Sequence, residues 1–417
     1  MIQLKQGVRL HVLPTKKYKT IHIYARFTTR LQRERMTKRS LLSNLLETNS
    51  ANYPDQTKLS AQLAELYGAS FGINVGRKGN LHWLNIGVSV VNGKYVNDPD
   101  ILPQAVDFFK EILFHPNIKE GSFDVQTFAL EKENLQSYLE SLNEDKQTLA
   151  SLKLQETYFT EEAQKIPSFG SLEDLVHETS QSIAAYYQEM LANDQIDIFV
   201  IGDVEEETLK GLFAALPFTD REETKPEIYY SQPVSNVIRE SQLQESVIQG
   251  KLNLAYSTGI YFQDKARFPL LVFNGLFGGF PHSKLFMNVR EKESLAYYAS
   301  SSFDTFRGYM NVQTGINSQN REKVLHLVAE QLQALQKGEF SELAFKQTKA
   351  MLRNQYLLGL DRPQNAIEIA YMEQWMPGTY LTDEQWLARL DAVTPQEVEK
   401  VAKQIQLQAI FFLDGGQ

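Results

Sequence analysis

The chain has 417 residues, of which 42% are hydrophobic and 22% charged, which is enough for two ordinary domains that each bury a core. This composition excludes an intrinsically disordered chain, and the formal net charge of -9 weighs against a nucleic-acid-binding surface, which is expected to be basic. The absence of cysteine excludes disulfide bonds, thiolate catalysis and cysteine-ligated zinc. Any metal would therefore need histidine and carboxylate ligands.

The sequence contains no recognisable membrane or secretion signal. Its longest hydrophobic run, Leu270 to Phe280, is about half of what a membrane-spanning helix needs. The N-terminal stretch MIQLKQGVRLHVL lacks both the apolar core and the cleavage site of a signal peptide. A cytoplasmic location is expected.

The first half of the sequence alternates short strands with helices. Val8 to Leu13 and Ile21 to Phe27 are rich in β-branched residues and predict strands, whereas leucines at helical spacing predict a helix over Arg39 to Thr48. A second helix is expected at Thr57 to Tyr67, and alternating residues from Leu84 to Val90 predict a strand with one buried face. Further helices are predicted at Gln104 to Phe114, Ser122 to about Glu156 and Ser180 to Leu191, before a buried strand at Ile196 to Asp203.

Charged residues, prolines and serines replace these patterns over residues 218–240, which predicts an exposed linker between domains 1–217 and 241–417. The same order of elements then returns: a strand at Leu252 to Ile260, helices at Pro269 to Phe277 and His282 to Lys292, strands at Leu295 to Ser302 and Tyr309 to Ile316, long helices, and a buried strand at Ala409 to Gly415. A repeat of about 200 residues implies two copies of one domain. The fold class is predicted as α+β, with a sheet covered by helices in each copy.

Three stretches carry a resemblance to a known family: Ile201-Gly-Asp203, Gly278-Gly-Phe-Pro-His-Ser-Lys-Leu-Phe286 and Arg290-Glu-Lys-Glu-Ser-Leu-Ala-Tyr297. With the two-half layout, they resemble the insulinase/pitrilysin peptidases, and most of all the short bacterial members that are similar to mitochondrial processing peptidase subunits. The resemblance implies two tandem homologous domains, each with a mixed, largely antiparallel sheet. It also implies that two chains pair around a chamber, in which an unfolded peptide lies as an added strand on a sheet edge.

Active members of that family carry H-x-x-E-H on the helix after the second strand. Histidines four residues apart share one helical face and hold zinc, and the Glu between them activates the zinc-bound water. When Leu46 to Pro54 is matched to the segment after this motif, Ser40, Ser43 and Asn44 occupy the positions of His, Glu and His. None of these side chains replaces an imidazole pair with a base.

The third zinc ligand of active members is a Glu on a later long helix. Matching Phe128 to Lys132 with the family pattern places Tyr138 at this position, although a small change of register would bring in Glu140. The seven histidines include no pair at i and i+4, so they offer no local replacement site. The resemblance therefore implies a degenerate zinc site with no metal or other cofactor bound by this chain.

A second feature of the family is retained. In active relatives an Arg and a Tyr seven residues later hold the substrate backbone and stabilise the developing oxyanion. Arg290 and Tyr297 have this separation, and the resemblance implies that they bind substrate.

Three functions remain open. The leading hypothesis is a catalytically inactive, substrate-binding subunit that forms a heterodimer with a zinc-bearing homologue and binds unfolded or short peptides. The alternative is a homodimeric peptide-binding or scaffold protein without a catalytic partner. A third possibility is an independent zinc peptidase whose ligands come from distant parts of the sequence. The sequence carries no residue signature for the substrate or the partner, and it does not separate the first two hypotheses.

Overall fold

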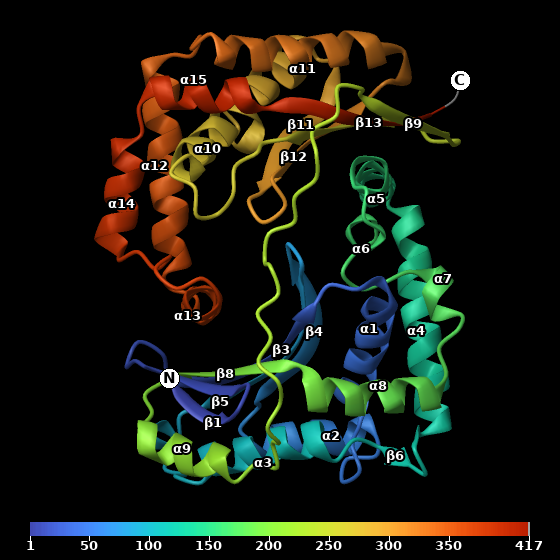
Figure 1. Cartoon of the computed structure of the whole chain (residues 1–417), viewed down its shortest axis with the longest axis vertical. Helices are drawn as coiled ribbons and strands as arrows, with labels where there is room; N and C mark the ends of the chain where they lie inside the picture. Colours follow the sequence, from blue (N-terminus) through green and yellow to red (C-terminus); the bar gives the residue numbers. More distant parts are fainter. Residues whose placement is uncertain (416–417) are drawn as a thin grey trace. The chain divides into compact units, whose positions relative to one another are not determined.

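The computed structural model describes residues 1–415. These residues form two compact units. The first unit contains Met1–Glu140, Pro167–Glu227 and Arg362–Pro377, and the second contains Ser141–Ile166, Ile228–Asp361 and the chain from Gly378 onward (Figure 1). Gly416 and Gln417, which end the predicted C-terminal domain, lie outside the described residues. The sequence-based boundaries treated each domain as one continuous stretch, whereas each compact unit is assembled from three stretches.

The first unit is built on a six-stranded sheet with the strand order β1-β2-β8-β3-β5-β4. The strands are β1 (Ile2–Lys5), β2 (Val8–Pro14), β3 (Thr20–Arg30), β4 (Ser70–Lys78), β5 (Leu81–Val91) and β8 (Gln195–Gly202). Neighbouring strands are antiparallel except β2 and β8, which are parallel. Since successive side chains of a strand point to opposite faces, Ile23 and Ile86 lie on one face of the sheet, and Arg26 and Asn85 lie on the other.

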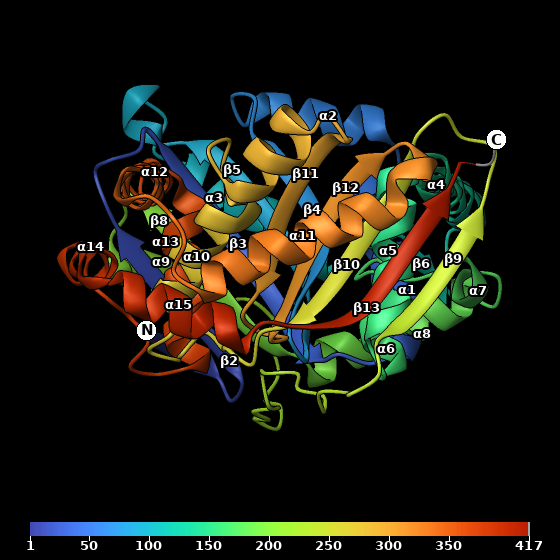
Figure 2. The same cartoon turned by 90° about the horizontal axis from the view of Figure 1, so that it is seen from above.

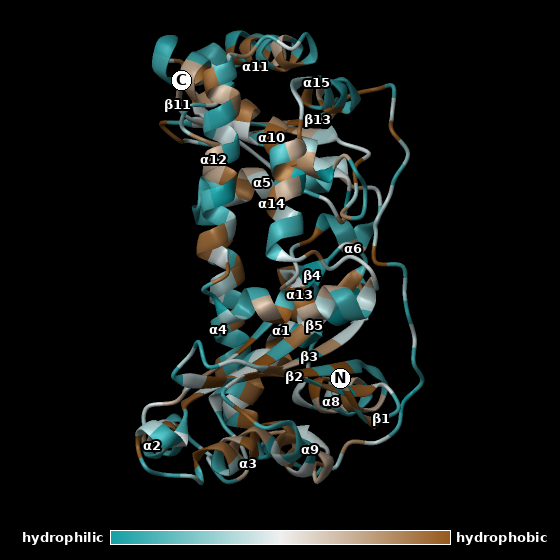
Figure 3. Ribbon diagram, turned by 90° about the vertical axis from the view of Figure 1, so that its left-hand side faces the viewer, coloured by the Kyte–Doolittle hydropathy of each residue, from teal (hydrophilic) through white to brown (hydrophobic). Residues whose placement is uncertain are grey.

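Helices cover the apolar face of this sheet. Besides the sheet, the early part of the chain forms α1 (Arg33–Thr48), α2 (Gln56–Glu65), η1 (Gly93–Tyr95), α3 (Ile101–Phe114), the hairpin β6 (Ile118–Lys119) and β7 (Ser122–Phe123), α4 (Val125–Glu144), α7 (Leu172–Leu175), α8 (Ser180–Asn193) and α9 (Glu206–Ala214). Phe71 of β4 meets Phe108 of α3 edge-to-face, with ring centroids 5.2 Å apart. Figure 3 shows hydrophobic and hydrophilic residues together on α3 and α9, as expected of amphipathic helices that cover a sheet.

The polar face of the first sheet is covered by α13 (Pro363–Trp375), a helix from late in the sequence. Tyr371 is completely buried there, and its hydroxyl group lies 3.2 Å from Thr28 Oγ1. Glu368 forms an ion pair with Arg26, and its Oε2 lies 2.9 Å from Lys78 Nζ. Helix α13 is therefore part of the core of the first unit.

The second unit contains a five-stranded sheet with the order β11-β12-β10-β13-β9. Its strands are β9 (Arg239–Gln244), β10 (Gly250–Ser257), β11 (Ala296–Asp304), β12 (Tyr309–Ile316) and β13 (Gln406–Asp414), and Figure 2 shows them side by side. Only β13 and β9 are parallel to each other among these neighbours. The directions of β9, β13, β10, β12 and β11 thus repeat those of β2, β8, β3, β5 and β4. The predicted duplication is visible in the topology.

The helices of the second unit lie on both faces of its sheet. They are α5 (Lys146–Tyr158), α6 (Glu162–Lys165), α10 (Arg267–Asn274), the π-helical turns η2 (Gly275–Gly279) and η3 (Leu285–Lys292), η4 (Ser318–Asn320), α11 (Arg321–Gln336), α12 (Glu342–Gly359), α14 (Asp383–Ala392) and α15 (Pro395–Gln404). Phe273 of α10, Val328 of α11 and Val401 of α15 share one hydrophobic core with β10 and β12. Leu149 and Leu154 of α5 pack in a separate core on the sheet with Phe411 of β13.

The predicted α+β class, with two domains that each contain a helix-covered sheet, is confirmed. The single long helix predicted from Ser122 to about Glu156 is wrong. The chain breaks at Asp145, whose carboxylate accepts a hydrogen bond from the Gln147 amide and caps the start of α5. Strand β4 was not predicted. Residues 217–238 form no helix or strand, and no helix within the described residues is long and apolar enough to cross a membrane.

Candidate functional site

Helix α1 carries the three positions matched to the zinc motif, and hydrophobic packing and a buried charge network hold it in place. Leucines on one side of the helix are completely or almost completely buried: Leu41, Leu42, Leu45 and Leu46. Arg39 is also completely buried, where its Nε donates to Tyr186 Oη at 2.7 Å and its guanidinium group donates to the Phe27 carbonyl at 2.9 Å. Arg39 forms an ion pair with Asp194 as well. The position of α1 depends on packing and on this buried charge network.

The three side chains matched to the zinc motif lie on α1, but they have the wrong chemistry for zinc. Ser40 and Ser43 are buried, and Ser43 Oγ donates to the Ser40 carbonyl at 2.7 Å. Asn44 is half-buried. A hydroxyl group engaged within its own helix and a neutral amide do not replace two imidazoles and a carboxylate.

The position predicted for the third ligand lies on α4. Tyr138 is 48% exposed and packs edge-to-face on Phe169, with ring centroids 5.3 Å apart. Glu140, the alternative in register, is exposed and accepts a hydrogen bond from Gln136 at 2.8 Å. Over residues 1–415, no group of three His, Asp or Glu side chains is arranged to hold a metal ion. The residues at this site therefore do not fit the zinc ion of the active relatives.

Two carboxylates that the sequence analysis did not single out lie where α1 meets α4 and β4. Glu47, one helical turn after Ser43, accepts a hydrogen bond from the Ile73 amide of β4 at 3.1 Å. Glu131 of α4 is buried and accepts a hydrogen bond from Thr48 Oγ1 at 2.8 Å. Burial raises the pKa of Glu47, the Ile73 amide opposes that shift, and the negative charge of Glu131 adds to it. No spacing in the sequence marks Glu47, because its contact with Ile73 depends on how α1 packs against β4.

Arg290 and Tyr297 lie in the second unit, on consecutive elements. Arg290 is at the end of η3, and its guanidinium group stacks over the Phe286 ring, 4.5 Å from the centroid. Tyr297 is the second residue of β11 and is 65% exposed. The turn between them contains Ser294 in a left-handed conformation, with φ of 54°. Within residues 1–415 the two side chains do not bond to each other, and both are accessible.

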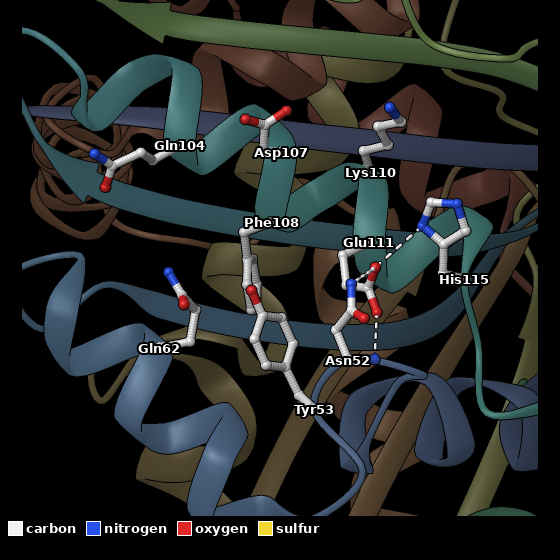
Figure 4. Close-up of a pocket in the computed structure, with 9 residues that line it drawn as sticks. All are labelled: Asn52, Tyr53, Gln62, Gln104, Asp107, Phe108, Lys110, Glu111 and His115. Atoms are coloured by element: carbon white, nitrogen blue, oxygen red, sulfur yellow. Dashed lines mark hydrogen bonds and ion pairs between the residues drawn. The ribbon is translucent and has the colours of Figure 1, made fainter.

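A groove of about 330 Å³ opens between α2, α3 and the loop after α1 (Figure 4). Its floor contains Glu111, whose Oε1 accepts from Ser50 Oγ and the Asn52 amide, each at 2.8 Å. Glu111 Oε2 accepts from Asn52 Nδ2 at 2.8 Å and lies 3.0 Å from His115 Nδ1. Four bonds occupy both carboxylate oxygens, so this acid fixes the loop and has little capacity left for a ligand.

Residues 177–352 match the family model described as "Peptidase M16 inactive domain". A relative from Bacillus subtilis (strain 168), "Probable inactive metalloprotease YmfF", is 33% identical over 411 residues, which cover 98% of this chain and 96% of the relative. The chain belongs to the M16 peptidase family. Within this family, which is the insulinase family expected from the sequence, it is a homologue of the inactive type.

Two further proteins are similar to this M16 chain. A crystal structure of a conserved protein from Enterococcus faecalis V583 superposes with a TM-score of 0.97 at 59% identity, covering 100% of this chain and 98% of that chain. The "Uncharacterized zinc protease YmxG" of Bacillus subtilis (strain 168) is 20% identical over 309 residues, which cover 72% of each chain. The predicted family is confirmed.

Proposed function

We propose that this M16 homologue is the non-catalytic, substrate-binding subunit of a peptidase complex and pairs with a zinc-bearing homologue. The observation that carries the proposal is that the chain lacks the zinc ligands of the family but has its two substrate-binding residues. Ser40, Ser43 and Asn44 lack the donors of a zinc site, whereas Arg290 and Tyr297 are present and accessible in the second unit. The chain thus lacks the ligands for zinc but has two side-chain donors that can bind a peptide backbone.

The open edge of the first sheet supports peptide binding. Strand β4 is the last strand of that sheet and is paired only with β5 among the described residues. An unpaired strand edge presents backbone donors and acceptors that an extended peptide can use by strand addition. This mode selects for an extended backbone, so unfolded or short peptides are the proposed ligands.

The chemistry of Arg290 and Tyr297 suits a contribution in trans. A guanidinium group carries five donors and keeps its charge when water is excluded, and a phenol adds a neutral donor. Both groups can bind a peptide carbonyl oxygen more tightly as negative charge develops on it. In the proposed complex they hold peptides that are cleaved at the active site of the partner subunit.

The names of the relatives support a catalytic partner. Bacillus subtilis (strain 168) contains both YmfF, described as a probable inactive metalloprotease, and YmxG, described as a zinc protease. One cell thus holds an inactive-type and a zinc-type M16 protein. A corresponding pair is the proposed context of this chain.

The test is co-expression with a zinc-bearing M16 homologue from the same cell, followed by size-exclusion chromatography and a peptidase assay on labelled unfolded peptides. The chain alone is expected to be free of zinc and inert, and to raise the activity of the homologue when the two are combined. Arg290→Ala and Tyr297→Phe are each expected to lower kcat of the complex by about 100-fold, because each removes a donor to the developing oxyanion.

Arg353→Ala and Tyr67→Phe are matched controls, since both residues are exposed and lie outside the proposed site. Unchanged activity of the complex in both test variants would remove Arg290 and Tyr297 from catalysis. A metal-free homodimer that binds peptides and leaves the activity of the homologue unchanged would contradict the subunit role and favour the scaffold alternative. Zinc at one ion per chain, with cleavage by the chain alone, would contradict both.

A further inference from the structure

The outer edge of β4 has a defined set of backbone groups. In an antiparallel pair, the amide and carbonyl of one residue point to the same side of the strand, and the side alternates from residue to residue. The Ile73 amide bonds to Glu47 on α1, so it points away from β5. The backbone groups of Phe71 and Val75, two residues away on either side, point in the same direction. These positions form the row to which an added strand would bond.

Glu47 occupies the middle of this row. Its Oε2 accepts the Ile73 amide at 3.1 Å, and its Oε1 lies beside Gly72, 3.9 Å from where a Cβ atom would stand on that residue. The carboxylate therefore takes the place of a carbonyl oxygen from a neighbouring strand. Helix α1 is packed along β4 and holds Glu47 in this position.

We propose that Glu47 is a specificity-determining residue of the β4 edge, because its carboxylate must leave the Ile73 amide before an extended peptide can pair across that position. This inference rests on the proposed binding of peptides at β4. A peptide whose backbone pairs with β4 both before and after Ile73 forms enough hydrogen bonds to displace the carboxylate, and it binds. A peptide that pairs with β4 on only one side of Ile73 does not displace the carboxylate and does not bind across that residue.

Few interactions other than the Ile73 hydrogen bond hold the Glu47 carboxylate in place. Within residues 1–415, neither Lys nor Arg forms an ion pair with Glu47, so its release breaks one hydrogen bond and no salt bridge. The carboxylate of Glu131 is its charged neighbour and repels it. Glu131 is itself retained by hydrogen bonds from Thr48 and Asn134, so it stays in place when Glu47 moves.

The binding experiment uses the full chain and an unstructured peptide of about 15 residues that has blocked termini, no ionisable side chain and an uncharged BODIPY label. Such a probe reports backbone pairing and not charge attraction. Glu47→Ala is expected to bind the peptide about tenfold more tightly than the wild type, since one charge-assisted hydrogen bond no longer has to be broken. Glu47→Gln, which keeps an acceptor for the Ile73 amide, is expected to fall between the two.

The matched control is Glu34→Ala, which removes an exposed acid from the same helix and is expected to leave the affinity unchanged. If the wild type binds the probe and Glu47→Ala binds it equally or more weakly, the role of Glu47 is wrong, while the proposed peptide binding stands. If neither the wild type nor any variant binds, the proposed peptide binding fails. If only Glu47→Ala binds, the carboxylate closes the edge completely, which supports the inference.

Amide hydrogen exchange gives a readout that does not depend on a peptide. The Ile73 amide is expected to exchange about tenfold faster in Glu47→Ala than in the wild type, whereas the amides of Gly72 and Asn74, which point toward β5, keep their rates. Equal acceleration at all three residues would show that the substitution loosens the whole strand. That result would overturn the local role assigned to Glu47.

Discussion

His82 of β5 is a completely buried ionisable residue next to the site helix. Its Nε2 donates to the Ser168 carbonyl at 2.8 Å, and its Nδ1 has no hydrogen-bond partner among residues 1–415. Burial, followed by the positive charge of Arg39, lowers the pKa of His82 to about 3. The imidazole is therefore neutral in the folded protein at any pH near neutrality.

This burial predicts an acid-sensitive stability. The unfolded chain binds a proton at the ordinary pKa of histidine, near 6.5, and the folded chain does so only near 3. The contribution of His82 to stability is thus complete above about pH 6.5 and is lost progressively as the pH falls toward 3. Urea unfolding of the wild type and of His82→Gln, measured at pH 7 and pH 5, is expected to show a smaller loss in the variant. Equal losses would assign the acid sensitivity to other groups.

Among the elements, α13 shows how charge can dock a helix. Burial alone would raise the pKa of Glu368, but the charges of Arg26 and Lys78 outweigh burial and lower it to about 2. The folded pKa lies below the ordinary range of Glu, so this contribution is present above about pH 4 and declines as the pH falls toward 2. The docking of α13 is expected to be strongest near neutral pH.

Glu368→Gln tests this docking. We expect a loss of about 1 kcal/mol in the free energy of unfolding at pH 7, a modest value because the Glu368 side chain is partly exposed. Hydrogen exchange in α13 should become faster, and the difference from the wild type should shrink at pH 3. Glu34→Gln is the matched control. An unchanged exchange rate in α13 would mean that Tyr371 and the other apolar contacts dock the helix without help from the ion pairs.

The elements that sequence patterns predicted are those whose side chains repeat with the period of the element. Strand β8 is buried along its whole length, and the leucines of α1 recur at helical spacing. Strand β4 was missed because Gly72, Asn74 and Gly76 interrupt its apolar pattern, and pairing with β5 makes it a strand. The break at Asp145 was missed because helical residues flank the capping residue on both sides.

The candidate site was predictable as far as it depends on one helix. Ser40, Ser43 and Asn44 share α1 because spacing along a helix is local. The contact of Glu47 with Ile73 joins residues that are 26 positions apart, and it depends on how α1 packs against β4. No local pattern in the sequence reports such packing.

The whole molecule combines a duplication with an exchange of helices. Each sheet carries on one face a helix from the other half of the sequence, which is α13 in the first unit and α5 in the second. The fragment 1–217, which matches the predicted N-terminal domain, lacks α13. Its Arg26 would lose Glu368, and the sheet surface that buries Tyr371 would be exposed.

We therefore expect that the fragment 1–217 does not fold alone and that co-expression with 218–417 restores a folded, associated pair. The measurement is circular dichroism with thermal unfolding for each fragment and for the co-expressed pair. A cooperative transition in the isolated fragment would show that α13 is dispensable for the first unit.

The residues that anchor α1 differ from the residues that match the zinc motif. Because the buried leucines and the Arg39 network anchor α1, substitutions at the positions matched to the zinc motif need not displace the helix. The fold around this helix therefore does not depend on the side chains that metal chemistry would need.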